Sequence, residues 1–359
     1  MQGFDANIVS RIRERSAAME RRGEPEAWLL EKIYDEKLFK LFVPRELNGL
    51  GCGLPEALRV FERMAWIDGS LGWLVTIGAG GGFFAGTLPE RPAAKLFAGR
   101  EAVLAGSGMP TGTARKIDGG YIASGRWRYC SGATFATFFT ANCQLEGEQD
   151  AAGGAKIRSF AFLPEQVRIV RDWNPLGLRA TASHTIEVSG AFVPEERMFD
   201  IASPPRYSDP IFRYPFLPFA QASFAAASLG MARHFLDECR EFAAAKADEW
   251  RAASPRRLAA LERTVDEWME ALSVSAARFY DFVDSTWKTF AAEGSLPDAA
   301  WREIGSRSQE TAAAARSASE AAFPLLGMAG LRYDEPLCRT WRDVHTVTQH
   351  SVLLPENGD

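Results

Sequence analysis

Asp118-Gly-Gly-Tyr-Ile-Ala-Ser-Gly-Arg-Trp-Arg-Tyr-Cys-Ser-Gly132 is the stretch of sequence that decides the fold. The pair Asp118-Gly119 favours a hairpin turn, because glycine tolerates the positive φ that such a turn needs. The alternation that follows predicts a strand, with one face formed by Tyr121, Ala123, Gly125, Trp127 and Tyr129 and the other by Ile122, Ser124, Arg126, Arg128 and Cys130. The strand ends in the small polar pair Ser131-Gly132. An aromatic face beside such a pair can hold a flat ligand with polar edges, although ordinary core packing produces the same pattern.

Around this stretch, from about residue 101 to 200, apolar residues recur with a period of two. The predicted strands are Ala102–Ser107, Tyr121–Tyr129, Phe138–Leu145, Ile157–Leu163, Val167–Val170 and His184–Val193. Turn residues separate them, which is typical of a small barrel or sandwich. The polar, glycine-rich segment Glu146–Ala155 predicts an exposed hairpin tip.

Both flanks of this region show the spacing of helices. Helices are predicted within Glu24–Phe42, at Leu54–Ile67, from Ser254-Pro255 with Ser254 as N-cap, over Asp298–Leu326 up to Gly327, and within Asp334–Leu354. The order is helices, then strands, then helices, without the strict alternation of a doubly wound fold. We therefore predict an α+β protein with an N-terminal helical domain (1–100), a central β-domain (101–205) and a C-terminal helical bundle (206–359).

Composition excludes several classes of protein. The 359 residues carry a net charge of -5 with no basic block, which argues against nucleic-acid binding. No apolar run reaches the length of a membrane span. Five scattered cysteines (52, 130, 143, 239 and 338) indicate reduced thiols in a cytoplasmic protein. The four histidines show no ligand spacing, so we predict no metal site.

One glycine motif imitates a nucleotide-binding fingerprint. Gly80-Gly-Gly82-Phe-Phe-Ala85 fits G-x-G-x-x-A, but no acidic residue and no βαβ series follow at the required distance. A glycine-rich helix or lid near a pocket is the better interpretation. A hydrolase is disfavoured as well, because the chain contains no Gly-x-Ser-x-Gly elbow.

Four further segments, taken in order, resemble the acyl-CoA dehydrogenase superfamily over nearly the whole chain. They are Phe42–Gly51, Ala65–Trp73, Asn174–Ser183 with Val188–Pro194, and Leu326–Gly330 with Arg342-Asp343. The resemblance implies that fold, a homotetramer, and a flavin between the β-domain and the C-terminal bundle. It places Trp127, Ser131 and Gly132 against the flavin ring, with the Ser131 hydroxyl at its N5 edge. Met109, just before Pro110, and Arg342 are predicted as further cofactor contacts.

The sequence departs from the dehydrogenases of this family at the position that decides their chemistry. These enzymes need a carboxylate to remove a proton from the thioester substrate, commonly nine residues after the Arg of the Arg-Asp pair. Here that position is Ser351, beside His350, and the next acid is Glu356 in a short polar tail. Acids on an earlier helix (Asp237, Glu241 and Asp248) leave a displaced base open. Without a placed carboxylate, proton abstraction loses roughly 10²–10⁴ in rate.

A second branch of the superfamily fits better, namely two-component monooxygenases that receive reduced flavin from a separate reductase. Asp68–Trp73, Pro110–Ala114, Gly120–Gly132 and Trp341–His350 resemble its signatures. Its members add O2 to reduced FMN or FAD and transfer one oxygen atom to a small substrate. Ser131 at N5 and the His350 imidazole supply the residue types that this chemistry needs. We therefore expect a flavin-dependent monooxygenase acting on a small cyclic or aromatic molecule. An acyl-CoA dehydrogenase with a displaced base and a non-enzymatic flavin-binding protein remain alternatives.

Overall fold

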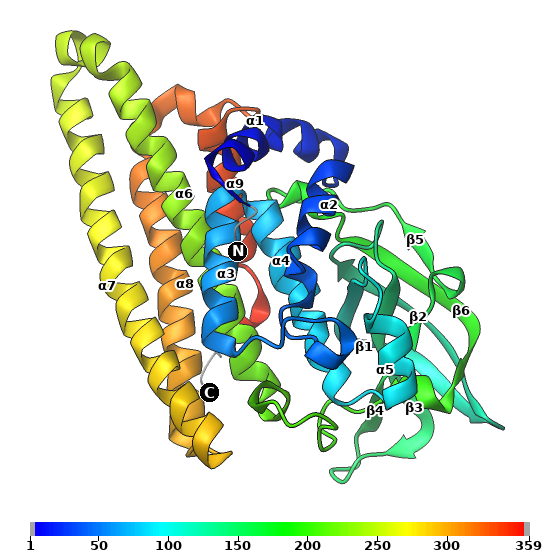
Figure 1. Ribbon diagram of the computed structural model, residues 1–359. Coiled ribbons are helices and arrows are strands. Elements are labelled where there is room, and N and C mark those ends of the chain that lie inside the picture. The colour runs from blue at the N-terminus through cyan, green and yellow to red at the C-terminus, as the bar shows by residue number, and fades with distance from the viewer. Residues whose placement is uncertain (1–3, 355–359) are drawn as a thin grey trace.

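The computed structural model describes residues 4–354 and has three layers (Figure 1). A bundle of long helices forms one side of the molecule and a β-sheet forms the other, with shorter N-terminal helices between them (Figure 1). The mixed helix-and-sheet architecture predicted from the sequence is confirmed. Its order along the chain is the one expected, with helices on both sides of the strands.

The N-terminal layer contains α1 (Ala6–Arg22), α2 (Ala27–Asp35), α3 (Leu54–Ile67), α4 (Gly69–Gly80) and α5 (Glu90–Phe97). Helix α3 has the predicted bounds. The glycine motif after Leu71 lies in α4 and a following 3₁₀ turn, so the helix interpretation is confirmed and a nucleotide-binding strand is absent there. Helix α4 is buried on nearly all sides, as expected of a helix that is apolar all round.

The central layer is one seven-stranded sheet with the order β5-β6-β2-β1-β3-β4-β7. Its strands are β1 (Leu104–Ile117), β2 (Gly120–Cys130), β3 (Phe138–Gln149), β4 (Ala155–Phe162), β5 (Arg168–Val170), β6 (His184–Pro194) and β7 (Met198–Phe199). All neighbours are antiparallel except β1 and β3. The predicted hairpin at Asp118-Gly119 joins β1 to β2, and Gly119 has a φ of 77°.

The C-terminal layer contains α6 (Phe216–Ala253), α7 (Pro255–Glu293), α8 (Asp298–Leu326) and α9 (Pro336–Val347). Helix α8 has the predicted bounds and stops at Gly327, whose φ is 58°. Helix α7 begins at Pro255 with Ser254 at the N-cap position, as expected, although the Ser254 side chain makes no capping hydrogen bond. Proline suits the first helical position because its fixed φ fits a helix and its missing N–H would have no partner within the helix.

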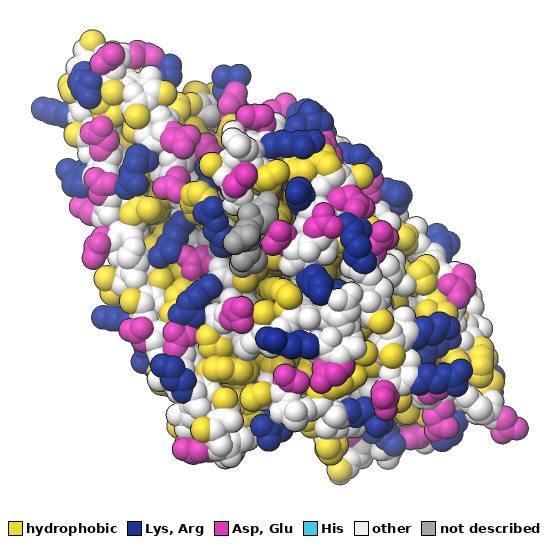
Figure 2. Space-filling model, in the orientation of Figure 1, with side chains coloured by type: hydrophobic (Ala, Val, Ile, Leu, Met, Phe, Trp, Pro, Cys, Tyr) yellow, Lys and Arg dark blue, Asp and Glu magenta, His cyan; other side chains and the backbone are white. Residues whose placement is uncertain are grey.

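Three apolar cores hold these layers together. The largest joins α3, α4 and α6 to the rest of the bundle, the second lies within the sheet, and the smallest packs α5 against β1, β3 and β4. On the surface, positive and negative side chains are interspersed, without a broad area of one sign on the visible face (Figure 2). No helix in residues 4–354 combines the length and apolarity needed to cross a bilayer. Over the same residues, no three His, Cys, Asp or Glu side chains group as a metal site.

Candidate functional site

The alternation of β2 breaks just before Ser131. It holds from Tyr121 to Arg128, but Tyr129 is 67% exposed and Cys130 is buried, which reverses their predicted faces. The cause is an irregularity in the pairing with β6 between Trp127 and Cys130, where Tyr129 adopts a left-handed φ of 67°. The aromatic ring presented at the end of this strand is therefore that of Tyr129.

Trp127 lies inside the sheet core and has no exposed surface. Its Nε1 donates a hydrogen bond to the Asn142 carbonyl at 2.9 Å. Gly112 and Gly125 flank the indole, and a methyl group at Gly112 would lie 2.1 Å from the ring. These contacts give Trp127 a packing role in the sheet, and its predicted cofactor contact stays a prediction.

Ser131 follows the end of β2 and lies against the N-terminal layer. Helix α4 is capped by Asp68, whose carboxylate accepts a hydrogen bond from the Leu71 N–H. This helix carries Trp73, whose Nε1 donates to Ser131 Oγ at 2.9 Å. Ser131 Oγ is also 2.8 Å from Ser183 Oγ. The structure thus surrounds the predicted serine with an indole N–H and a second hydroxyl.

A short loop before β6 closes the other side of Ser131. Gly132 has a φ of 79° and donates its N–H to the Thr181 carbonyl at 2.8 Å. Within the loop, Leu178 and Ala182 both adopt left-handed φ values of 54° and 46°. Such conformations cost about 1–3 kcal/mol each in non-glycine residues and persist only where neighbouring contacts enforce them.

Helix α9 supplies those contacts. Asp343 Oδ1 accepts a hydrogen bond from the Leu178 N–H at 2.6 Å, and Thr346 accepts from the Gly177 N–H at 2.8 Å. Burial, aided by the nearby Asp68 carboxylate, raises the pKa of Asp343 to about 7. Arg342, the residue before Asp343 on α9, is also buried and forms an ion pair with Glu20 of α1.

The Arg342 side chain contacts two other segments, and its Nη2 lies 3.0 Å from Oε2 of Glu20. Arg342 Nη1 also donates to the Leu176 carbonyl at 2.7 Å. The Arg342 side chain therefore ties α1, the loop and α9 together. These contacts are structural, and the predicted role of Arg342 as a cofactor contact stays a prediction.

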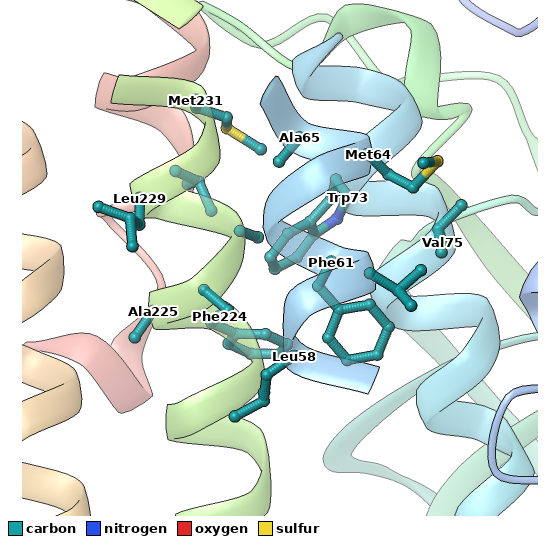
Figure 3. Packing of buried hydrophobic residues seen from close by; sticks show 14 of the residues in the cluster. Leu58, Phe61, Met64, Ala65, Trp73, Val75, Phe224, Ala225, Leu229 and Met231 are labelled. Carbon is teal, nitrogen blue, oxygen red and sulfur yellow. The ribbon is translucent and has the colours of Figure 1, made fainter. Parts of the chain in front are cut away.

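His350 follows the end of α9, and its ring lies near Trp73, the residue that donates a hydrogen bond to Ser131. Ser131, Ser183, Thr181, Trp73 and His350 are here called the cluster. The His350 and Trp73 rings are 5.9 Å apart between centroids, and Phe224 lies edge-on to His350 at 4.5 Å. Trp73 and Phe224 come from α4 and α6 and meet where these helices pack, with their rings 4.8 Å apart (Figure 3). The structure thus brings Ser131, Gly132 and His350 together, with Trp73 as the shared neighbour.

The His350 imidazole is held as a neutral ring. Burial lowers its pKa to about 4, and no charged side chain contributes to that change. Nδ1 accepts a hydrogen bond from the Val352 N–H at 3.4 Å, so the hydrogen of the neutral ring is on Nε2. Within residues 4–354, Nε2 has no hydrogen-bond partner, which leaves it able to donate to a ligand.

The candidate carboxylates for a displaced base lie away from this cluster. Asp237 accepts a hydrogen bond from the Trp66 indole at 2.8 Å. Glu241 and Asp248 are exposed on α6. Glu356 falls outside the described residues. None of these α6 carboxylates therefore contacts Ser131, whereas the His350 imidazole shares the neighbour Trp73 with it.

Two observations bear on whether a flat, polar-edged cofactor fits here. Thr134 Oγ1, three residues after Ser131, is buried and has no hydrogen-bond partner in the described part of the chain. Tyr129 also presents an exposed ring next to the cluster. Met109 is 61% exposed on β1, so its predicted cofactor contact stays a prediction. The cavities between α7 and α8 and beside Leu353 are not lined by the cluster. Thr134 and Tyr129 thus offer a polar group and an aromatic ring to a ligand beside Ser131, which is itself buried.

Sequence reasoning missed three members of this cluster. Trp73, Thr181 and Ser183 all lie in segments that carry the family resemblance, yet none was given a role. The run Thr181-Ala-Ser183 was the available signal, because two small hydroxyl residues before a strand resemble Ser131 after one. Only the tertiary contacts show that they meet.

Comparison with known proteins agrees with this geometry. Residues 222–355 match the family model described as acyl-CoA dehydrogenase, C-terminal domain. Indole-3-acetate monooxygenase from Pseudomonas putida is 28% identical over 88% of this chain and 80% of its own length. The flavin-dependent monooxygenase oxygenase subunit HsaA from Mycobacterium tuberculosis is 24% identical over 98% of this chain and 91% of its own.

Solved structures share the whole fold. The 3-HSA hydroxylase from Rhodococcus sp. RHA1 matches with a TM-score of 0.83 and 23% identity, over 98% of this chain and 92% of the other. XiaF from Streptomyces sp., in complex with FADH2 and glycerol, matches with a TM-score of 0.79 and 22% identity, over 97% and 91%. The architecture is therefore that of acyl-CoA dehydrogenase-like monooxygenases.

Proposed function

We propose that this chain, a member of the acyl-CoA dehydrogenase superfamily with flavin-dependent monooxygenases as its relatives, is the oxygenase component of a two-component system. It would use reduced FMN or FAD and O2 to oxygenate a small cyclic or aromatic molecule. A separate flavin reductase would supply the reduced flavin, in keeping with the relative named as an oxygenase subunit.

One observation carries the proposal. His350 shares its neighbour Trp73 with Ser131, and its imidazole is neutral because burial lowers its pKa. A dehydrogenase of this superfamily needs a carboxylate at its reacting centre, whereas the described candidates on α6 are exposed or bonded to Trp66. The chemistry of the side chains therefore favours oxygen transfer over proton abstraction.

Reduced flavin, when bound, supplies the electrons that activate O2, so that one oxygen atom enters the substrate and the other leaves as water. Ser131 and Gly132 would orient the ring edge. Trp73 and Phe224 would exclude water, because both are buried next to His350. The Nε2–H of His350 can donate a hydrogen bond at that place, with Nδ1 held by the Val352 N–H.

The proposal extends to assembly and location. The resemblance supports a homotetramer. The five cysteines are all free and buried, which supports a reducing compartment such as the cytoplasm. Ser131 and His350 are the proposed catalytic residues. The hydrogen bonds of Trp127 and Arg342 support roles in holding the sheet and the loop.

The test is to titrate the protein anaerobically with chemically reduced FMN and FAD, and separately with both oxidised flavins. We expect tighter binding of a reduced form. Mixing the loaded protein with O2 should then give a transient absorption band distinct from both flavin states. A protein isolated with tightly bound oxidised FAD that an acyl-CoA bleaches without air would instead be a dehydrogenase. Failure to bind any flavin would overturn both.

A further inference from the structure

Ser131 belongs to a continuous series of hydrogen bonds, here called the hydroxyl chain, that runs from Trp73 to the carbonyl of Leu178. Its links are Trp73 Nε1 to Ser131 Oγ (2.9 Å), Ser131 Oγ to Ser183 Oγ (2.8 Å), Ser183 Oγ to Thr181 Oγ1 (2.7 Å) and Thr181 Oγ1 to Leu178 O (2.8 Å). All three hydroxyl residues are buried. Each link lies within the normal range for its atoms.

The two ends fix the direction of every link. The indole of Trp73 can only donate, and the carbonyl of Leu178 can only accept. Two oxygens 2.8 Å apart need a hydrogen between them, so the Thr181 hydroxyl must donate to Leu178 O. Thr181 then has no hydrogen left for Ser183, and Ser183 must donate to Thr181.

The same reasoning reaches Ser131. Because the single hydrogen of Ser183 is used at Thr181, Ser131 must donate its own hydrogen to Ser183. Trp73 already donates to one lone pair of Ser131. The Ser131 hydroxyl therefore has one free lone pair and no free hydrogen, so it can only accept from a ligand.

We propose that Ser183 and Thr181 make the site selective for reduced flavin by fixing the Ser131 hydroxyl as an acceptor. This inference rests on the proposed function, in which Ser131 meets the N5 edge. Reduced flavin carries a hydrogen on N5 that Ser131 can accept. Oxidised flavin presents only a lone pair there, which would face the lone pair of Ser131. A buried polar group left unmatched lowers affinity by a factor on the order of ten to a hundred.

The chain offers matched variants for a test. Ser183→Ala removes the acceptor of the Ser131 hydrogen and frees that hydrogen for oxidised N5. Thr181→Val acts one link further away, because Ser183 can then turn its hydrogen towards Ser131. Thr181→Ser keeps every hydroxyl and is the control.

The readout is the ratio of dissociation constants for oxidised and reduced FMN and FAD, measured by anaerobic titration. We expect Ser183→Ala and Thr181→Val to lower this ratio roughly tenfold, because the affinity for oxidised flavin rises. The two-electron potential of the bound flavin should shift by about 30 mV in consequence. Thr181→Ser should keep the wild-type ratio. If the first two variants bind flavin with an unchanged ratio, the inference is wrong and the proposed function stands.

A measurement on the unaltered protein keeps the inference testable if the variants fold poorly. In oxidised 5-deazaflavin, a C–H group replaces the lone pair at position 5. The wild-type protein should therefore bind oxidised 5-deaza-FMN or 5-deaza-FAD roughly tenfold more tightly than the corresponding oxidised flavin. Equal affinities would overturn the inference. A protein that binds none of these flavins would overturn the proposed function with it.

Discussion

Asp343→Asn should make the protein more resistant to unfolding at alkaline pH than the wild type is. Asp343 is buried in α9, and its Oδ1 accepts the Leu178 N–H. Burial and the Asp68 carboxylate raise the pKa of Asp343 from its ordinary value of 3.8 to about 7. An asparagine keeps the acceptor for Leu178 and can direct its NH₂ group towards Asp68. It removes only the charge.

The sign and size follow from linkage. Between pH 3.8 and 7 the folded protein holds a proton on Asp343 that the unfolded chain has lost, so the free energy of unfolding falls as the pH rises. At about 1.4 kcal/mol per pKa unit, the whole loss is ~4 kcal/mol, and the part between pH 5 and pH 8 is ~3 kcal/mol. The asparagine variant lacks this loss.

The assay is urea unfolding of both proteins at several pH values from 5 to 8. The difference in unfolding free energy, variant minus wild type, should increase by ~3 kcal/mol across this range, because the titrations of all other groups cancel. Asp281→Asn, at an exposed position on α7, is the control and should give a flat difference. A difference that is flat or falls with pH for Asp343→Asn would refute the reasoning.

Four further outcomes are expected. Gly112→Ala should lower stability by about 1–3 kcal/mol in thermal unfolding because its methyl group would meet a buried indole, whereas Gly108→Ala, with open space around it, should not. Arg342→Met should cost about 3–5 kcal/mol in the same assay by leaving buried Glu20 with only the 3.8 Å contact to Arg179, and a loss under 1 kcal/mol would contradict a buried pair. His350→Ala should reduce product formation while flavin affinity stays nearly unchanged, and equal loss of both would indicate a structural role. The free energy of unfolding of the wild type should fall by ~3 kcal/mol between pH 6.5 and 4, because His350 takes up a proton in the unfolded chain but stays neutral in the folded protein. His350→Asn should abolish this fall.

Much of the architecture could be predicted from the sequence because its helices carry strong local signals. Leu54–Ile67 and Asp298–Leu326 have the predicted bounds: the first shows regular apolar spacing, and the second ends at a glycine that adopts positive φ. The strand after Asp118-Gly119 could be predicted equally well, from its alternation, up to Arg128. Beyond that point alternation fails, because an irregular pairing and a left-handed Tyr129 reverse the last two faces.

The candidate site was predictable only in part. Ser131 and His350 stand out because the family resemblance marks the positions at which they occur. Their neighbours do not, since a hydrogen bond between Trp73 and Ser131 depends on how a helix docks on a sheet and leaves no spacing pattern. The neutral state of His350 likewise comes from burial, which no motif records.

The cluster around Ser131 has a consequence for how the molecule matures. Trp73 and Ser131 are 58 positions apart, Ser131 and Ser183 are 52 apart, and Gly177 reaches Thr346 across 169. Contacts of such long range form after local ones, because the entropy of closing large loops must first be overcome. Flavin binding at the proposed site would therefore require all three layers to be docked. A mutation that prevents this docking would abolish binding while the helical content is still intact.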